Sequence, residues 1–258
     1  MNNDFRVHII VSLKENIRLD GRKLDEYRPI KIQYGVSRTA EGSAMVSIGE
    51  TKVIAGVKML IAEPFPDKPD EGTIMVNAEL LPMSNPLFEP GPPGDNAIEL
   101  ARVVDRGIRE SKAIDVKKLL IKKGEKCWVV SIDIITVNDS GNLFDASALA
   151  AVAAIQDTTL PLYENDEINY KKRTEERLPI TKLPVSVTVI KIGDSYIVDP
   201  LPEEEAACDA RLTAATTEDG TICALQKGGN ETLSIDDVSA MLDIAIEKAR
   251  YLRGCLKS

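Results

Sequence analysis

The chain has 258 residues and a net charge of −9, with 43% apolar and 28% charged residues. This apolar fraction is enough to bury a core, and the 16 glycines and 14 prolines show no period, which excludes disordered, collagen-like and low-complexity chains. Charges interrupt every apolar run before about 18 residues and no basic-then-apolar leader opens the chain, so we expect a cytoplasmic protein without membrane contact.

The first third of the chain is predicted to be mainly β. An apolar segment at residues 5–13 indicates a helix, and a turn at Asp20-Gly21 follows it. Strands are then expected near residues 30–34, 44–48, 52–60 and 73–80, because glycine or proline separates these β-rich segments. A stretch rich in proline and glycine, residues 82–94, ends this first sheet.

A β–α step is predicted for the middle of the chain. Asp95 or Asn96 is expected to cap a helix that runs to about residue 114, because apolar residues recur there on one arc. A β-branched strand at 127–137 and a turn at 138–141 precede an alanine-rich helix at about 145–156. Small residues on several faces of that helix predict close packing against a sheet.

The last third repeats the order of strands followed by a helix. Strands are expected at 183–192, 195–199, 211–217 and 221–225, and Ser234 with Asp237 forms a capping-box pattern for a final helix that Gly254 ends. We therefore predict an α+β fold in which two β–α halves, about 18–160 and 180–253, pack together within a single domain, 1–258.

The cysteines and the single histidine argue against metal and disulfide chemistry. The four cysteines are far apart and include no CxxC pair, whereas zinc sites and disulfide frameworks use clustered ligands. They are typical of buried thiols in a reducing compartment. One histidine leaves little basis for histidine-dependent catalysis.

The basic residues are concentrated in one segment. Residues 99–126 hold nine Lys/Arg against five Asp/Glu, and a local excess of positive charge can attract phosphates within about a Debye length. Arg102, Arg106 and Arg109 share one side of the predicted helix, opposite its apolar face, and guanidinium forks suit phosphodiester oxygens. The alternative is an ordinary solvated face whose arginines pair with neighbouring acids along the helix.

A second candidate is the acidic run of Asp199, Glu203, Glu204, Glu205 and Asp209. Paired carboxylates can hold Mg²⁺ or serve as acid and base, although glutamates in a loop are more often solvated. A metal-dependent hydrolase built on this run would lack a histidine ligand set. The turn at 138–142 could present backbone N–H groups to a phosphate before the alanine-rich helix.

Five ordered motifs between Arg18 and Leu252 resemble one known family. They are Arg18-Leu-Asp-Gly-Arg22 with residues 26–29, residues 42–49 with 51–55, residues 98–106, Asp139-Ser-Gly-Asn142 with residues 145–146, and Val198-Asp-Pro with residues 203–206. Together they resemble the ribonuclease PH family, most closely its non-catalytic ring subunits of the archaeal exosome. The resemblance implies two β–α halves, assembly into a six-membered ring, and RNA cleavage from the 3′ end by phosphate in the active members.

The departures from the active members imply an inactive subunit. Active members have an Arg-Arg pair where this chain has Asp95-Asn96, and a Gly-Ser/Thr-Arg phosphate loop where it has Gly141-Asn142-Leu143. Leucine cannot neutralise a phosphate, and acids or amides in place of arginines invert the local field. The catalytic carboxylate position falls on Arg211 by ungapped counting, or on Asp209 after a shift of two residues, and this choice stays open.

The resemblance also implies partners and a division of labour. We expect a catalytic ribonuclease PH-like subunit in a hetero-oligomeric ring, RNA-binding cap subunits and single-stranded RNA. Phosphate and Mg²⁺ would be used at the partner's site, so this chain would need no cofactor. Arg102, Arg106 and Arg109 would contact RNA beside that site. The alternative is that the chain is itself an active phosphate-dependent 3′-to-5′ exoribonuclease.

Overall fold

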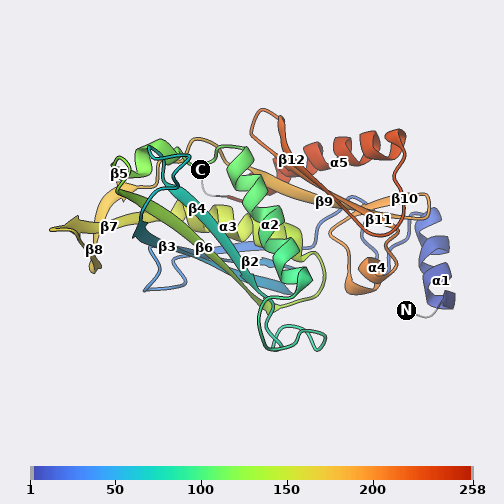
Figure 1. Cartoon of the computed structure of the whole chain (residues 1–258). Coiled ribbons are helices and arrows are strands. Elements are labelled where there is room, and N and C mark those ends of the chain that lie inside the picture. The colour runs from blue at the N-terminus through green and yellow to red at the C-terminus, as the bar shows by residue number, and fades with distance from the viewer. Residues whose placement is uncertain (1–2, 257–258) are drawn as a thin grey trace.

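Two β-sheets organise the computed structural model, which describes residues 3–256 (Figure 1). The first sheet has the order β1-β2-β3-β6-β4, with β5 paired to β6, and only the β4–β6 pair is parallel within it. Its strands are β1 (Ile30–Tyr34), β2 (Gly42–Ile48), β3 (Thr51–Ala62), β4 (Thr73–Glu79), β5 (Leu120–Lys122) and β6 (Lys126–Asn138).

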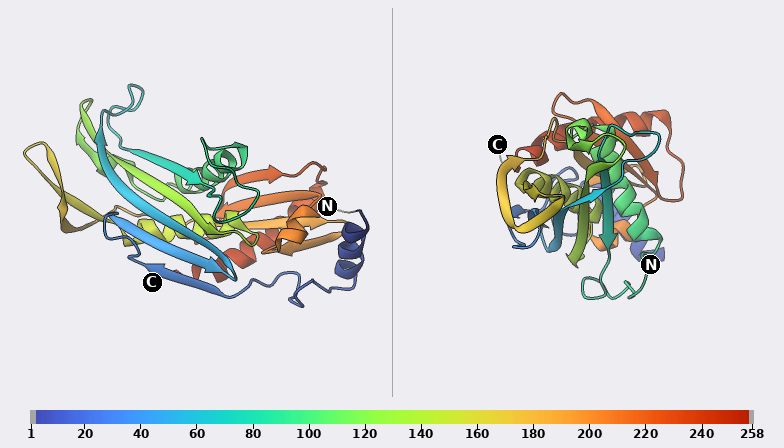
Figure 2. Two further views of the ribbon diagram at one scale, coloured as in Figure 1. Left: turned by 90° about the horizontal axis from the view of Figure 1, so that it is seen from below. Right: turned by 60° about the vertical axis from the view of Figure 1, so that its left-hand side comes forward.

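The second sheet has the order β10-β9-β11-β12 and is antiparallel throughout. Its strands are β9 (Val185–Ile192), β10 (Ser195–Val198), β11 (Ala210–Thr216) and β12 (Ile222–Gly228). A separate hairpin, β7 (Thr159–Glu164) with β8 (Glu167–Arg177), projects from the body at the end of the first sheet (Figure 2).

Helices pack on the two sheets around one main core and a smaller second cluster beneath the N-terminal helix. They are α1 (Asn3–Lys14), α2 (Asp95–Glu110), the 3₁₀ turn η1 (Val116–Leu119), α3 (Leu143–Asp157), α4 (Pro202–Ala206) and α5 (Ile235–Arg253). The central helix α3 contacts β2 and β3 of the first sheet and β9 of the second. All its residues from 145 to 155 are buried, and its alanines let both sheets approach closely.

Helix α2 lies across the junction of the two sheets. It packs on β4, on α3 and on β12, with Leu100, Val104 and Ile108 on its buried face. Gly107 gives the closest approach, because a Cβ there would lie 3.4 Å from the side chains of Ala215 and Ser186. The packing leaves the opposite side of α2 toward solvent.

Most of the predicted elements are confirmed in chain order, including the α+β class and the capping box of Ser234 with Asp237 at the start of α5. The predicted cap of α2 was wrong: Gly94 is its N-cap and makes no side-chain cap bond. The helix also ends at Glu110, four residues early, because Lys112 adopts a left-handed φ of +56°. Ile114 then bridges to Ile180 instead of extending the helix.

The β7–β8 hairpin was not predicted. Its second strand reads EINYKKRTEER, and most of its described side chains are exposed, so no buried face imposes an alternating pattern on this strand. Among residues 3–256, no helix is long and apolar enough to cross a membrane.

Candidate functional site

The loop between β6 and α3 packs directly on the segment that follows β10. Gly141 and Asn142 have φ values of +84° and +61°, a conformation that glycine adopts freely and asparagine tolerates. A Cβ on Gly141 would overlap the carbonyl oxygen of Pro200, so a side chain does not fit at this position. The turn therefore holds the start of α3 tightly against the second half of the chain.

Asp199 is the buried acid at the centre of this contact. Arg28 donates to both of its carboxylate oxygens, at 2.8 Å from Nε and 2.6 Å from Nη2, and Arg22 Nη1 adds a bond at 2.8 Å. Asn142 Nδ2 donates to the same carboxylate at 3.0 Å. Burial opposes ionisation, but the bonds and charge of Arg28 outweigh it and lower the pKa of Asp199. Asp199 is thus an ionised structural anchor.

Asp145 lies in the first turn of α3 and is also fully buried. It accepts hydrogen bonds from the Tyr27 hydroxyl at 2.6 Å and from Asn142 Nδ2 at 3.2 Å. Burial raises the pKa of Asp145 to about 7, against the opposing effect of these bonds. No lysine or arginine of the described chain forms an ion pair with it, so its charge is sensitive to pH near neutrality.

The glutamates at 203–205 form the short helix α4 instead of a loop. Glu203 and Glu205 are exposed, as the sequence predicts, whereas Glu204 is 0% exposed, which corrects the expectation for that residue. Its carboxylate pairs with Arg18, at 2.6 Å from Nη2 and 3.0 Å from Nε, and Arg18 also donates to the carbonyls of Val198 and Asp199. A charged run in sequence cannot reveal a cation 186 residues away that pairs with it.

Glu205 turns its carboxylate toward the loop and accepts the backbone N–H of Asn142 at 2.8 Å. Glu205 is exposed as a residue, but desolvation of its carboxyl group beside the loop and the nearby charge of Asp139 raise its pKa to about 7, while the Asn142 bond opposes the shift. In residues 3–256 no group of three or more His, Cys, Asp and Glu side chains is arranged to hold a metal ion. The acids that a metal-dependent hydrolase would need are bonded to arginines and backbone amides instead.

Arg211, rather than Asp209, faces the first turn of α3. Its guanidinium lies over the Phe144 ring at 4.0 Å from the centroid, and Nη2 is 2.6 Å from Glu99 Oε1 on α2. This contact ties α2, α3 and β11 together and places a cation beside the loop.

Asp209 points the other way, toward the N-terminal helix. It pairs with Arg6 of α1 and accepts the backbone N–H of Gly193 at 2.6 Å. Its carboxylate therefore secures α1 to the turn between β9 and β10.

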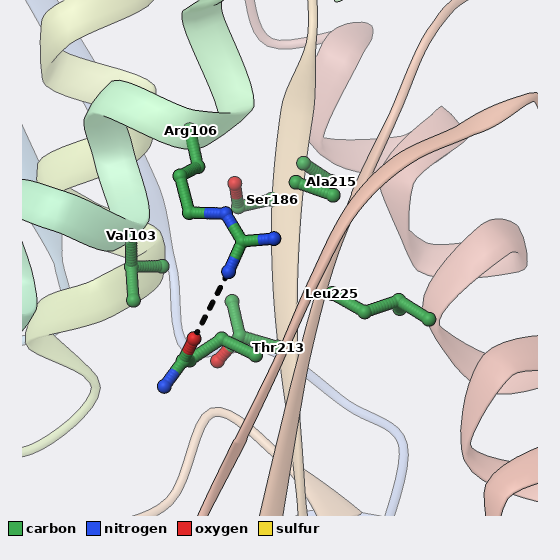
Figure 3. Close-up of a pocket in the computed structure, with 8 residues that line it drawn as sticks. Val103, Arg106, Ser186, Thr213, Ala215 and Leu225 are labelled. Atoms are coloured by element: carbon green, nitrogen blue, oxygen red, sulfur yellow. Dashed lines mark hydrogen bonds between the residues drawn. The ribbon is translucent and has the colours of Figure 1, made fainter. Parts of the chain in front are cut away.

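The three arginines of α2 differ in how firmly the protein holds them. Arg109 donates to both carboxylate oxygens of Asp105, at 3.0 and 2.6 Å, and to the carbonyl of Ile74 at 2.7 Å. Arg106 reaches over β9 and β11 toward Ser186 and Thr213, and its one hydrogen bond, to Gln226, is long at 3.5 Å (Figure 3).

Arg102 is exposed, and no hydrogen bond or ion pair engages its side chain within the described part of the chain. It lines a groove of about 600 Å³ between α2 and the free edge of β4. Half-exposed Met75 and Ile98 line the same groove. Arg102 and Arg106 are therefore available to an external anion, whereas Arg109 is bonded within the chain.

Sequence patterns missed most of the partners in this site. The sequence indicated these partners only indirectly. Four of them are members of a family motif, namely Arg18, Arg22, Tyr27 and Arg28, and Glu99 is one of several acids on a predicted helix. Their bonding depends on contacts between segments more than 110 residues apart. Pairing of this kind has no local sequence signal.

Comparison with known proteins covers nearly the whole chain. Residues 26–161 match the profile of the 3′ exoribonuclease family, domain 1, and residues 182–248 match domain 2 of the same family. The chain is 49% identical over 252 residues to the exosome complex component Rrp42 of Archaeoglobus fulgidus, covering 98% of this chain and 95% of the relative. It is 44% identical to the protein of that name from Methanopyrus kandleri, covering 98% and 96%.

Solved structures agree. The chain is similar to a chain of the Archaeoglobus fulgidus exosome with RNA bound to the active site, with a TM-score of 0.91, 48% identity, and 98% and 97% of the two chains covered. A chain of an archaeal exosome core gives a TM-score of 0.86 at 45% identity, with 97% and 95% covered. Rice Rrp46 shares the fold alone, with a TM-score of 0.68 at 18% identity over 92% and 96%.

Proposed function

Since the chain belongs to the ribonuclease PH family of 3′ exoribonucleases, we propose that it is the non-catalytic subunit of an exosome ring. In that role it structures the active site of a neighbouring catalytic subunit and helps to bind single-stranded RNA there. The observation that carries the proposal is the pair Arg102 and Arg106, which lie exposed on α2 without firm partners, whereas Arg22, Arg28 and Arg211 pair with acids inside the chain.

Lack of catalysis is supported by the charges around the loop at 139–142. Arg211 stands beside the first turn of α3, where Asp209 was the other candidate for the catalytic carboxylate. The loop offers asparagine and leucine in place of a phosphate-binding arginine, and Glu205 occupies its Asn142 N–H. A phosphate at this loop would find the Asn142 N–H taken by Glu205 and the nearby guanidiniums of Arg28 and Arg211 already paired with Asp199 and Glu99. This disfavours the alternative that the chain is itself an active phosphorolytic exoribonuclease.

RNA contact is assigned first to Arg102 and Arg106. An exposed guanidinium can donate two parallel hydrogen bonds to a phosphodiester. In doing so Arg102 would lose no partner among the described residues, and Arg106 would lose only its long bond to Gln226. Arg109 is bonded to Asp105 and Ile74, so its main contribution is to hold α2 against β4. Its Nη1 group remains able to assist a neighbouring phosphate.

The proposed partners follow from the relatives. We propose a catalytic ribonuclease PH-like subunit in a hetero-hexameric ring, with RNA-binding cap subunits, in the cytoplasm. The chain would carry no cofactor of its own, and phosphate and Mg²⁺ would act at the partner's site. Its similarity to a chain of an exosome with RNA bound to the active site supports a place for it in a complex that binds RNA.

The test is RNA binding by the ring reconstituted with its catalytic partner. Arg102→Ala and Arg106→Ala should each weaken binding of single-stranded RNA and flatten the slope of log affinity against log salt by about 0.7. Degradation should slow when RNA is limiting and recover at saturating RNA, because the reacting groups sit on the partner. Lys118→Ala, which removes an exposed cation elsewhere in the basic segment, is the matched control.

An unchanged salt slope in the double variant would reject the arginine assignment. Lack of catalysis has a separate test: the purified chain alone is given single-stranded RNA, Mg²⁺ and phosphate. We expect no release of nucleoside diphosphates, and release by a verified pure sample would establish the alternative, an active exoribonuclease.

A further inference from the structure

A second groove opens where α2 ends. Its volume is about 950 Å³, and it lies between the β3–β4 loop, the last turn of α2, η1 and the start of the segment before β9. The buried side chains of Ile74, Ile108 and Ile114 line it, each at most 3% exposed. The groove is thus a surface depression whose base is formed by well-packed apolar side chains.

Three lysines on its rim have no ion-pair partner among the described residues: Lys112, Lys117 and Lys182. All three are exposed; Lys112 and Lys117 belong to the basic segment 99–126, and Lys182 comes from the segment before β9. A fourth, Lys68, lies 3.7 Å from Glu71. The fold thus adds Lys182 and Lys68 to two lysines that the sequence already groups.

The acids of the groove are partly neutralised. Glu71 faces Lys68, and Asp115 accepts the backbone N–H of Lys117 at the start of η1. Asp67, Glu110 and Asp115 form no ion pair among the described residues, so they equal the three unpaired lysines in number. The rim therefore offers separate cations rather than a net positive field, and it suits a ligand whose spaced phosphates meet individual lysines while its apolar parts contact the floor.

An aromatic side chain stands beside these cations. Phe65, in the β3–β4 loop, is 60% exposed and lines the groove, although only 4% of the chain is aromatic. Exposed aromatic rings next to lysines are the combination that binds single-stranded nucleic acid, since bases stack on the ring while phosphates meet the cations.

The groove is continuous with the surface proposed for RNA. Ile74 and Arg109 line both this groove and the groove between α2 and β4 that holds Arg102. We propose that single-stranded RNA continues along this path, from Arg102 past Arg109 into the groove of Phe65, Lys112, Lys117 and Lys182. The inference rests on the proposed function and adds a second, upstream contact for longer RNA.

The experiment compares labelled oligouridylates of increasing length on the reconstituted ring. Lys112→Ala, Lys117→Ala and Lys182→Ala combined should leave the shortest bound RNA unaffected but weaken longer RNA, flattening the salt slope by about 2. Phe65→Ala should weaken only the longer RNA, by about 5- to 150-fold if one base stacks on the ring. RNA containing 4-thiouridine should photocrosslink to the peptide around Phe65.

The matched control is the triple alanine variant of Lys118, Lys122 and Lys123. These lysines are equally exposed and lie in the same basic segment but outside the groove. The proposal would be overturned if the control and groove variants lose the same amount of affinity for longer RNA. It would also be overturned if neither variant changes that affinity. So would loss of a partner protein from the variant ring in light scattering with RNA affinity intact, because the groove would then dock protein.

The assignment of the α2 arginines and the proposal for the groove can be rejected independently. If Arg102→Ala with Arg106→Ala leaves the shortest RNA unaffected while the groove variants weaken longer RNA, the groove stands and the α2 assignment does not. If the double arginine variant weakens RNA of every length and the groove variants weaken none, the proposed function stands and the groove path does not.

Discussion

The buried site around Asp199 and the solvent face of α2 both carry arginines, but they use them in opposite ways. Arg18 and Arg28 are at most 7% exposed, and each is bonded to a buried carboxylate and to backbone carbonyls. Arg102 and Arg106 are exposed and have at most one long hydrogen bond. Charge alone therefore does not distinguish the two groups of arginines; the presence or absence of an internal partner does.

The energetic consequences differ as well. A buried ion pair is costly to break from one side, because the remaining charge is left uncompensated in a poorly polarisable interior. An exposed cation contributes little to stability and can be replaced without unfolding the chain. Variants in the two regions should thus separate stability from RNA binding.

The largest expected effect is on stability, from Arg18→Met. Removing this guanidinium leaves the Glu204 carboxylate buried without its cation and frees the carbonyls of Val198 and Asp199. We expect a loss of about 3–5 kcal/mol in the free energy of unfolding, measured by urea denaturation. Lys14→Met, at an exposed pair with Asp194, should cost less than about 0.5 kcal/mol.

The double variant Arg18→Met with Glu204→Met should recover much of that loss, because no unpaired charge remains in the interior. If the Arg18 variant is as stable as the Lys14 variant, the contrast between the two regions is lost.

The next effect is a pH dependence from Asp145. Its pKa is raised by burial from 3.8 to about 7, so the folded chain holds a proton that the unfolded chain releases. The stabilising contribution of that proton is complete below about pH 3.8 and is lost as pH rises to about 7. Relative to wild type, Asp145→Asn should therefore gain stability across this range, by on the order of 1–3 kcal/mol.

Unfolding free energies of the two proteins at several pH values give the measurement. The difference between them removes contributions from other groups, including Glu205, whose pKa is also raised to about 7. A difference that stays constant from about pH 4 to 7 would mean that Asp145 is ionised throughout that range.

The order of the elements could be predicted from the sequence because it depends on local patterns. The alanine-rich helix is an example, since side chains small on every face predict the double-sided packing that α3 shows. So is α5, where Ser234 and Asp237 cap the helix within one turn. The end of α2 was missed because the left-handed Lys112 gives no residue-type signal, unlike a glycine.

The pairing of charges could not be predicted in the same way. Glu204 is buried because Arg18 reaches it from 186 residues away. The opposite orientations of Asp209 and Arg211 depend on the position of Arg6 on α1 and of Phe144 on α3. Likewise, the three α2 arginines looked equivalent by helical spacing. Only the carbonyl of Ile74 and the carboxylate of Asp105 distinguish Arg109 from the other two.

The smallest effect provides the closest comparison, because it sets Arg109→Ala against Arg102→Ala on the same helix. Arg109 is half-exposed and pairs with Asp105 four residues earlier, so its loss should lower stability by only about 0.5–1 kcal/mol, whereas loss of Arg102 should leave stability unchanged. The effects on RNA affinity of the reconstituted ring should be the reverse: Arg102→Ala should flatten the slope of log affinity against log salt by about 0.7, and Arg109→Ala should change that slope less.

A lysine substitution at each position separates the two roles further. Arg102→Lys keeps a phosphate-binding charge and should retain most of the affinity, while in Arg109→Lys the ammonium cannot form the fork with Asp105 and reach Ile74 together. Equal effects of the two alanine variants on both stability and salt slope would show that an internal partner does not decide which arginine meets RNA.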